Sequence, residues 1–508
     1  MKKALLIEIL KAPDYQAALK QGVELIVCQR SLVESPEIKV VMADDYRVEG
    51  SWLAYQYNQS IWQVMRSKSP NEWQIDGIDI APMVPKKLYW SNHSIGAIYA
   101  AAEQFKSTHF FIDQIQYFPK NRIKQTLKWI MLQLKFFKEV LFHKYPKPIK
   151  IKGSIGVLLN SQFEFELYLP VLKYIKHKGL IVFHYGNIDA NVLQEFTHTD
   201  ISNIGQKLSF KFLKYFKWTS EELSAYNFIQ SKWINSTNAI ARIKFIHSTG
   251  IKVLLTNVAE NLPLRNLMKP IFGKDIMLYN AMNGLKAGEA HDADVYFDYW
   301  FVWDTQLKQL LHQMCKIPLE SLIEVGHLSQ DLIANYVNKQ TYKSFLDTHQ
   351  GKRVISIFSV RGERQEKTEV LNWMHHILAT RQDVVFIIKP HPLEHDFKSI
   401  NHPNMFVVPT EYGNQKQALY DQIFASEFVV VFGSTVAYES AWMQTKAYNF
   451  ELRPKPFIQA NAHILIEHIN STSSLDKALE QKPLIKLSIN IESHVAFNMA
   501  KHMLSHVE

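Results

Sequence analysis

Two apolar stretches near the end of the chain lead into residues that could bind or protonate a phosphate. The first stretch is Val384–Ile388, which continues into Lys389, Pro390, His391 and Pro392. The prolines restrict the backbone on both sides of His391 and remove two N–H donors, so the imidazole is held on a stiff turn. There it could donate a hydrogen bond to a phosphate or a proton to a leaving group. A capped loop histidine is the alternative interpretation.

The second stretch is Phe428–Phe432, which leads into Gly433, Ser434 and Thr435. A Ser-Thr pair that opens a helix caps it, and the N–H groups at such a helix start attract anions. Glu439 follows about one helical turn later, where its carboxylate could reach the hydroxyl groups of a ribose. An ordinary helix cap is the alternative role. One βαβ unit separates the two strand ends, so we expect both sets to converge on one phosphate.

Short β-rich apolar runs alternate with helical patterns around these motifs, which is typical of βαβ units with parallel sheets. In such open sheets ligands bind beyond the carboxyl ends of the strands, where both motifs fall. The strands expected in this region are Val354–Phe358, Val384–Ile388, Met405–Val408, Phe428–Phe432 and Ala447–Phe450.

The same alternation divides the 508 residues into three regions, in line with domains of about 150 residues each. Two prolines within Tyr145–Pro148 interrupt a helical pattern and mark the first boundary. We predict an N-terminal α/β region at 1–150, a first Rossmann-like domain at 151–345 and a second Rossmann-like domain at 346–508.

The two motifs resemble the His-Pro motif and the Ser-Ser/Thr motif of bacterial sialyltransferases, polysialyltransferases and capsule Kdo transferases. In those families the motifs bind the CMP of the donor. Lys389–Pro392 is also similar to the corresponding stretch of the CDP-glycerol glycerophosphotransferases of teichoic acid synthesis. The resemblance implies the GT-B type of α/β fold, in which two Rossmann-like domains face each other across a cleft.

A transferase of this kind needs further charged groups. Arg361 follows the strand Val354–Phe358 and could pair with a phosphate or an acidic sugar, although a salt-bridged surface loop suits it equally. Inversion requires a base that takes the proton of the acceptor hydroxyl. No base motif of the similar families has a clear match, so the candidates are Glu164, after the strand Ser154–Leu159, and Glu289, in a glycine-containing loop. A solvated surface acid is the competing interpretation of both.

Signals for metals and cofactors are weak. The Asp-x-Asp pair within His291–Asp294 binds a metal in another class of glycosyltransferases, but here it runs into an apolar strand. We interpret it as a solvated loop, and we expect no required metal and no cofactor apart from the nucleotide-activated sugar. Cys28 and Cys315 are too few for a disulfide framework or a cysteine zinc site and favour a reducing cytosol.

The charge of the chain is concentrated in one segment. Residues 120–152 contain ten Lys or Arg residues and one acid, Glu139, which accounts for the +9 of the whole chain. Helical spacing places Lys124, Lys128, Lys135 and Lys138 within about 80° of one another. The apolar residues predicted to lie beside them are Ile123, Leu127, Ile130, Leu134, Phe137 and Leu141. Such a helix either bridges domains or lies on an anionic membrane. No recognised nucleic-acid module accompanies it, so we expect no nucleic-acid partner.

The sequence therefore predicts a cytoplasmic GT-B glycosyltransferase of bacterial surface polysaccharide synthesis, peripheral to the membrane if 120–152 docks there. It would transfer an acidic, CMP-activated sugar to a glycan or a lipid-linked glycan. The alternatives are a CDP-polyol phosphotransferase, a UDP-sugar transferase or epimerase, and a non-catalytic scaffold that binds sugars or membranes. We expect neither a signal peptide at Met1–Ile7 nor a membrane span.

Overall fold

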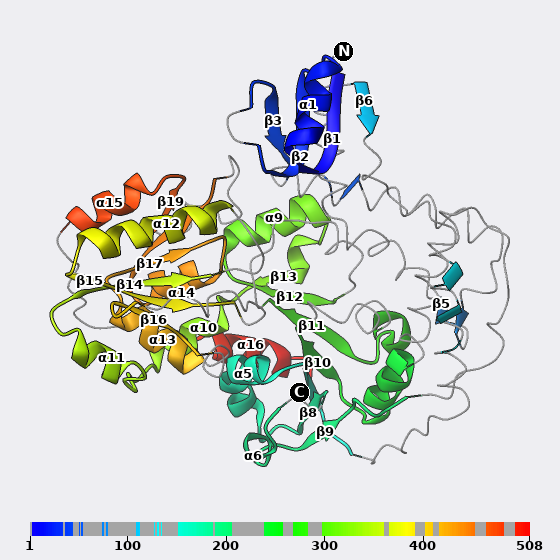
Figure 1. The fold of residues 1–508 in the computed structure, drawn as a ribbon. Coiled ribbons are helices and arrows are strands. Elements are labelled where there is room, and N and C mark those ends of the chain that lie inside the picture. The colour runs from blue at the N-terminus through cyan, green and yellow to red at the C-terminus, as the bar shows by residue number, and fades with distance from the viewer. Residues whose placement is uncertain are drawn as a thin grey trace.

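The protein contains three parallel sheets with helices packed on them (Figure 1). The structure is a computed structural model. It describes residues 3–33, 36–43, 50, 52–53, 74–75, 78–79, 108–111, 126–127, 130–131, 134, 151–185, 188–205, 238–257, 268–282, 297–359, 365–391, 402–409, 416–452, 464–481 and 493–507.

The N-terminal sheet is small and lies apart from the two larger sheets (Figure 1). Its strand order is β3-β2-β1-β6, with β1 at Lys3–Leu10, β2 at Leu25–Ser31, β3 at Lys39–Met42 and β6 at Thr108–Phe111. Helix α1 (Ala12–Lys20) follows β1, and its Tyr15 hydroxyl accepts hydrogen bonds from the Glu37 and Ile38 amides at 2.6 and 3.2 Å. A short antiparallel pair, β4 (Gln74–Ile75) and β5 (Ile78–Asp79), forms a separate ribbon.

The second sheet has seven parallel strands in the order β13-β12-β11-β10-β7-β8-β9. The strands are β7 (Ile155–Leu159), β8 (Leu180–His184), β9 (His198–Asp200), β10 (Val253–Thr256), β11 (Met277–Ala281), β12 (Tyr299–Val302) and β13 (Leu322–Glu324). The helices of this region include α5 (Gln162–Ile175), α6 (Ala190–Leu193) and α9 (Thr305–Cys315). A 3-10 turn occupies Leu319–Ser321. Every residue of β7, β8 and β10 is buried, as expected of strands covered on both faces.

The third sheet has six parallel strands in the order β16-β15-β14-β17-β18-β19. The strands are β14 (Arg353–Phe358), β15 (Val384–Lys389), β16 (Met405–Val407), β17 (Phe428–Val431), β18 (Lys446–Phe450) and β19 (Ile466–Ile469). Its helices are α12 (Gln365–Thr380), α13 (Lys416–Ala425), α14 (Val436–Trp442) and α15 (Ser473–Glu480). The five strands predicted here agree with the structure closely, and β19 is an addition.

Three further helices connect the two large sheets: α10 (Leu328–Ala334), α11 (Lys343–Thr348) and α16 (Val495–Leu504). The last helix, α16, follows the third sheet in the chain but packs its buried side with α5 in the core of the second sheet. The Asp331 carboxylate of α10 accepts a hydrogen bond from the Ala496 amide at 2.5 Å, which ties the two connecting helices together. Two doubly wound parallel sheets with this connection form the GT-B architecture, so the predicted fold class is confirmed.

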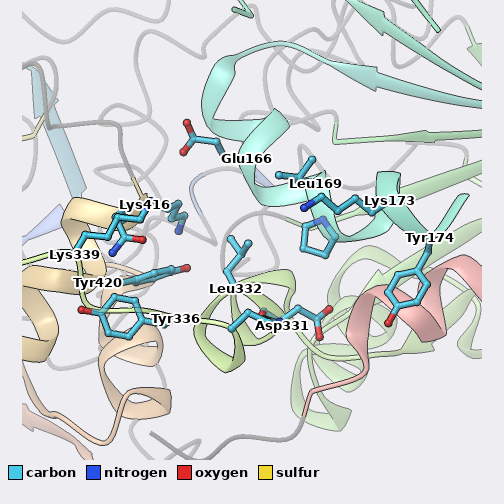
Figure 2. A pocket seen from close by; sticks show the side chains of 13 residues that line it. Glu166, Leu169, Lys173, Tyr174, Asp331, Leu332, Tyr336, Lys339, Lys416 and Tyr420 are labelled. Carbon is cyan, nitrogen blue, oxygen red and sulfur yellow. Dashed lines mark hydrogen bonds between the residues drawn. The ribbon is translucent and has the colours of Figure 1, made fainter. Parts of the chain in front are cut away.

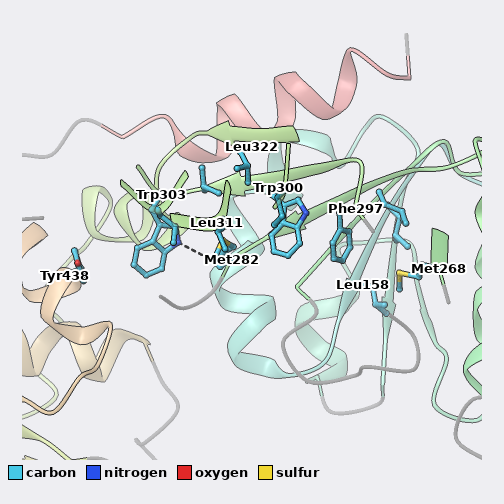
Figure 3. Packing of buried hydrophobic residues seen from close by; sticks show 14 of the residues in the cluster. Leu158, Met268, Met282, Phe297, Trp300, Trp303, Leu311, Leu322 and Tyr438 are labelled. Carbon is cyan, nitrogen blue, oxygen red and sulfur yellow. Dashed lines mark hydrogen bonds between the residues drawn. The ribbon is translucent and has the colours of Figure 1, made fainter. Parts of the chain in front are cut away.

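An aromatic contact fixes the two Rossmann-like domains against each other. A continuous buried cluster contains residues of both sheets (Figure 3). The Trp303 ring, after β12, lies 5.9 Å from Tyr438 of α14 in an edge-on arrangement, and its indole donates to the Met282 carbonyl at 3.1 Å. His327 contacts both Trp303 and Trp442, with centroid distances of 4.3 and 5.6 Å, and the two tryptophan rings are 6.2 Å apart. The start of α14, where the second motif lies, is therefore held by the first domain.

Candidate functional site

The predicted phosphate-binding residues lie at the carboxyl edge of the third sheet. Strands β15 and β17 both pair with β14, and Lys389 and Val431 lie opposite the same residue, Phe358. Because neighbouring strands are about 4.8 Å apart, the two strand ends lie roughly 10 Å from each other. The two motifs therefore flank β14 at the same level, at the topological switch point of the sheet where such folds bind ligands.

The turn after β17 depends on Gly433, whose φ of 70° is in the left-handed region. Its amide donates to the Asn449 side chain at 2.7 Å. The Ser434 hydroxyl accepts a hydrogen bond from the Val436 amide at 3.3 Å, whereas the Thr435 side chain makes no capping bond. The helix-cap interpretation therefore applies to Ser434 and not to Thr435.

Lys389 ends β15 half-buried, and Pro390 and His391 follow it. Burial, together with the nearby positive charge of Lys416, lowers the pKa of Lys389 to about 8, and Glu439 acts in the opposite direction. Two lysines that repel each other in a partly dehydrated position favour a bound anion, which would relieve the repulsion.

Glu439 belongs to a group of polar residues that we call the charged cluster: Ser329, Lys389, Lys416, Tyr420 and Glu439. All are buried except the half-buried Lys389. The Glu439 side chain is 2% exposed, and its Oε1 atom accepts hydrogen bonds from the Ser329 hydroxyl at 2.6 Å and from Lys416. Burial alone would raise the pKa of Glu439, but the charge and hydrogen bonds of Lys416 and Ser329 bring it below its usual range. The predicted contact of Glu439 with a ribose stays a prediction; in this arrangement the carboxylate holds Lys416.

Lys416 joins the two domains and was not predicted as a site residue. Its ammonium group lies 4.8 Å from the centre of the Phe163 ring of α5 and 5.7 Å from that of Tyr420. Both are distances at which a cation is attracted to an aromatic face. A helical pattern at Gln415–Ile423 predicts the helix that begins at Lys416, but the partners of the Lys416 side chain come from distant segments.

Glu164, the first candidate base, is 8% exposed and therefore is not a solvated surface acid. Its two carboxylate oxygens accept hydrogen bonds from the Asn160 amide at 2.5 Å and from the Asn257 side chain at 3.2 Å. Its own amide donates to the Ser161 hydroxyl, so Ser161 and Glu164 together stabilise the start of α5. The role of Glu164 as a base stays a prediction, and the visible role is structural.

The remaining predicted site residues, Arg361, Pro392 and Glu289, lie outside the described residues, as does the Asp-x-Asp segment 291–294. Among the residues that the structure describes, no cluster of His, Cys, Asp and Glu side chains could hold a metal ion. Within the same part of the chain, no helix has both the length and the apolar character that a membrane crossing requires.

A pocket of about 780 Å³ opens beside the charged cluster, between the two Rossmann-like domains (Figure 2). Its walls come from α5, from α10 and the residues after it, and from the first turns of α13. Lys416 lines the pocket and also belongs to the charged cluster. The lining residues are Glu166, Leu169, Pro170, Lys173, Tyr174, Asp331, Leu332, Asn335, Tyr336, Lys339, Lys416, Gln417 and Tyr420.

The pocket combines aromatic rings with neutral and charged hydrogen-bonding groups. Tyr174, Tyr336 and Tyr420 come from three different elements (Figure 2). The Tyr336 hydroxyl donates to the Asp421 carboxylate at 2.6 Å, which fixes that ring in place. Fixed rings beside amides such as Asn335 suit a ligand that has both apolar faces and hydroxyl groups. A sugar has this chemistry.

No protein-family model matches the chain, and the search of curated proteins gives no match. Among solved structures, the chain is similar to the wall teichoic acid polymerase TagF, with 12% identity over 77% of this chain and 98% of that chain and a TM-score of 0.43. It is also similar to S. aureus MnaA in complex with UDP (11%, 70% and 97%, 0.49) and to the Neisseria meningitidis UDP-GlcNAc 2-epimerase bound to UDP-GlcNAc (13%, 69% and 100%, 0.48). At these TM-scores the likenesses carry no argument about substrate or reaction.

Proposed function

We propose that the protein is a glycosyltransferase of bacterial surface polysaccharide synthesis that uses a nucleotide-activated sugar. The donor phosphate would lie between the ends of β15 and β17. The resemblance of both motifs to those of CMP-dependent transferases favours CMP and an acidic sugar. The two free cysteines favour a reducing cytosol, and we place the reaction there. The acceptor would be a glycan or a lipid-linked glycan.

The observation that carries this proposal is the excess of positive charge in the charged cluster. Lys416 is near enough to Lys389 to lower its pKa, and the carboxylate of Glu439 interacts with both lysines. A phosphate beside Lys389 would balance the remaining charge and accept charge-assisted hydrogen bonds. His391 and the Thr435 hydroxyl lie at the same edge of the sheet and could complete its coordination.

The pocket beside the cluster would hold the acceptor. Its size falls within the range of small-molecule sites, and Lys416 forms part of its wall next to the donor position. Sugar rings could pack on the tyrosine faces while amide and charged groups bind the hydroxyls. The acceptor hydroxyl would then be presented toward the donor at the cleft.

In the reaction, the acceptor oxygen forms a bond to the anomeric carbon of the donor, and the bond between that carbon and the phosphate oxygen breaks. The acceptor proton passes to a base, for which Glu164 and Glu289 remain the candidates. The nucleotide leaves with an additional negative charge on its phosphate. Lys389 and His391 would stabilise this charge as it develops.

Nucleotide binding tests the donor site. We expect CMP to raise the melting temperature of the protein more than CDP or UDP does, because a ligand that binds only the folded state stabilises it. Replacement of Lys389 by Gln should weaken CMP binding about tenfold or more, because it removes a charge-assisted contact. Lys343→Gln is the control: this lysine of the connecting helix α11 is exposed and pairs with Asp347.

The outcomes separate the rival functions. A preference for CDP would favour a polyol phosphotransferase, and a preference for UDP would favour a UDP-sugar transferase or an epimerase. If no nucleotide changes the melting temperature, and His391→Ala makes no difference, the enzyme proposal is wrong and a non-catalytic scaffold is the better interpretation.

A bulky substitution tests the acceptor pocket separately. Leu169 lines the pocket from α5, so Leu169→Trp should fill part of it. We expect the KM for an acceptor oligosaccharide to rise about tenfold while the CMP-induced shift in melting temperature stays unchanged. An unchanged KM, or a loss of CMP binding, would contradict the assignment of this pocket to the acceptor.

A further inference from the structure

Four large apolar side chains lie exposed on one face of a helix in the segment 120–152. Leu127 is 58% exposed, Ile130 42%, Met131 67% and Leu134 60%. All four are helical, and their spacing of three, four and seven residues from Leu127 places them on the same side of the helix. We call these four residues the apolar stripe.

The apolar stripe differs from the other exposed apolar residues of the described chain. Leu32, Val337 and Ile464, for example, are exposed singly on unrelated elements, which is normal for a protein surface. Here four such residues lie within eight positions. A contiguous apolar face in water is unfavourable and marks a surface that binds a partner. The structure thus favours an outward-facing helix over one packed on two sides between domains.

The charge of the same segment indicates the class of partner. Residues 120–152 carry ten Lys or Arg residues and one acid, whereas the basic and acidic residues of the rest of the chain balance. A second copy of this segment would be repelled by its own positive charge. A nucleic acid would match the charge but has no surface for four aliphatic side chains. An anionic bilayer offers negative charge and an apolar surface together, because its phosphate groups lie directly above the acyl chains.

We propose that this helix lies in the headgroup layer of an anionic membrane, with the apolar stripe inserted among the acyl chains. The basic residues of the segment would bind the lipid phosphates. This inference does not depend on the proposed reaction. If both hold, docking would bring the enzyme to the surface where a lipid-linked glycan is found.

Vesicle binding of the full-length protein tests the proposal. We expect the protein to float with vesicles that contain phosphatidylglycerol, to bind pure phosphatidylcholine vesicles weakly, and to dissociate as salt is raised. Replacing Met131 and Leu134 together by Gln should reduce the partition coefficient about tenfold or more. The matched control replaces Val337 and Ile464 by Gln, which are 67% and 92% exposed and lie elsewhere.

Two results would overturn the proposal. The variant with Gln at 131 and 134 could bind anionic vesicles as tightly as the wild type does, or the control variant could lose as much binding as that variant. Absence of a preference for phosphatidylglycerol would also overturn it. Size-exclusion chromatography with light scattering covers the remaining alternative: if the stripe variant changes only the oligomeric state, the stripe is a self-association surface. CMP-induced stabilisation of the same variants reports on the proposed reaction independently.

Discussion

The carboxyl ends of the strands carry different chemistry in the two Rossmann-like domains. In the first domain the buried carboxylate of Glu164 is satisfied by N–H groups of Asn160 and Asn257. In the second domain the buried carboxylate of Glu439 is paired with a lysine, Lys416, and a second lysine, Lys389, is close by. The buried acid of the first domain is therefore surrounded by neutral hydrogen-bond donors. The buried acid of the second domain has more positive than negative charge around it.

This difference suggests how the two domains divide their functions. A dianionic or monoanionic phosphate is stabilised where cations exceed acids, which is the edge of the third sheet. A hydroxyl-rich ligand needs hydrogen-bonding groups and rings, which the pocket along α5 provides. The contrast between Glu164 and Glu439 thus separates the proposed donor side from the proposed acceptor side, and each can be altered alone.

The largest expected effect comes from removing the charge of each buried acid. Glu439→Gln leaves the buried Lys416 without its ionic partner, and such losses destabilise proteins by about 3–5 kcal/mol. Glu164→Gln retains an oxygen that accepts from the Asn160 amide, so we expect a loss of only about 1 kcal/mol. Urea unfolding of both variants measures the difference in the free energy of unfolding.

A second substitution provides the control for the ion pair. In the Glu439→Gln background, Lys416→Met removes the unpaired charge and keeps most of the apolar stem. We expect it to restore much of the lost stability, because a buried pair replaced by uncharged groups is often tolerated. Equal destabilisation by Glu439→Gln and Glu164→Gln, without rescue, would show that the two sides of the cleft do not differ in this way.

The sequence was informative wherever the signal is local. Strands that are covered on both faces are apolar along their whole length. The runs Val384–Ile388 and Phe428–Phe432 show this pattern, and both are strands in the structure. The order of strands and helices was enough to predict parallel α/β sheets, and the resemblance of the two motifs to those of known transferases implied the GT-B fold. Ser161 and Glu164 also have the spacing of a helix-capping pattern, which indicates a structural role for Glu164 at the start of a helix.

The sequence was uninformative where contacts join distant segments. Glu439 is 23 residues from Lys416 and 110 residues from Ser329, so no spacing rule connects them. The pocket likewise draws its tyrosine rings from α5, from the segment after α10 and from α13, and these rings come together only after the domains have packed. The exposure of the apolar stripe depends on what else covers that helix, which periodicity alone does not reveal.

A change of pH should affect the donor side more strongly than the acceptor side. Because the pKa of Lys389 is about 8, this lysine is charged below that pH and loses its proton above it. An anion binds the charged form, so the affinity for CMP should fall as pH rises beyond about 8, by up to tenfold per unit. Calorimetric titration from about pH 7 to about pH 9.5 measures this decline in the affinity for CMP.

The matched variant is Lys389→Arg, which stays charged over this range. It should bind CMP with little dependence on pH, whereas Lys343→Gln should follow the wild-type curve. In the unliganded protein, the lowered pKa of Lys389 makes stability depend on pH. Folding lowers the pKa of Lys389 from 10.5, so the unfolded chain binds more protons between these values and the contribution of Lys389 to stability rises from pH 8 toward 10.5. A pH-independent affinity in the wild type would exclude Lys389 from the phosphate contact.

The smallest expected effect concerns metal removal. If Lys389 and Lys416 supply the positive charge on the donor side, chelation by EDTA should leave the CMP-induced rise in melting temperature unchanged. The alternative is that the Asp-x-Asp pair at 292–294 holds a metal that binds the phosphate, as in another class of glycosyltransferases. A loss of stabilisation on chelation that magnesium or manganese restores, and that Asp292→Asn and Asp294→Asn abolish, would favour this alternative. In that case a metal from the first domain would share the phosphate with the lysines of the second, and the division between the two sides of the cleft would be less sharp than their buried acids suggest.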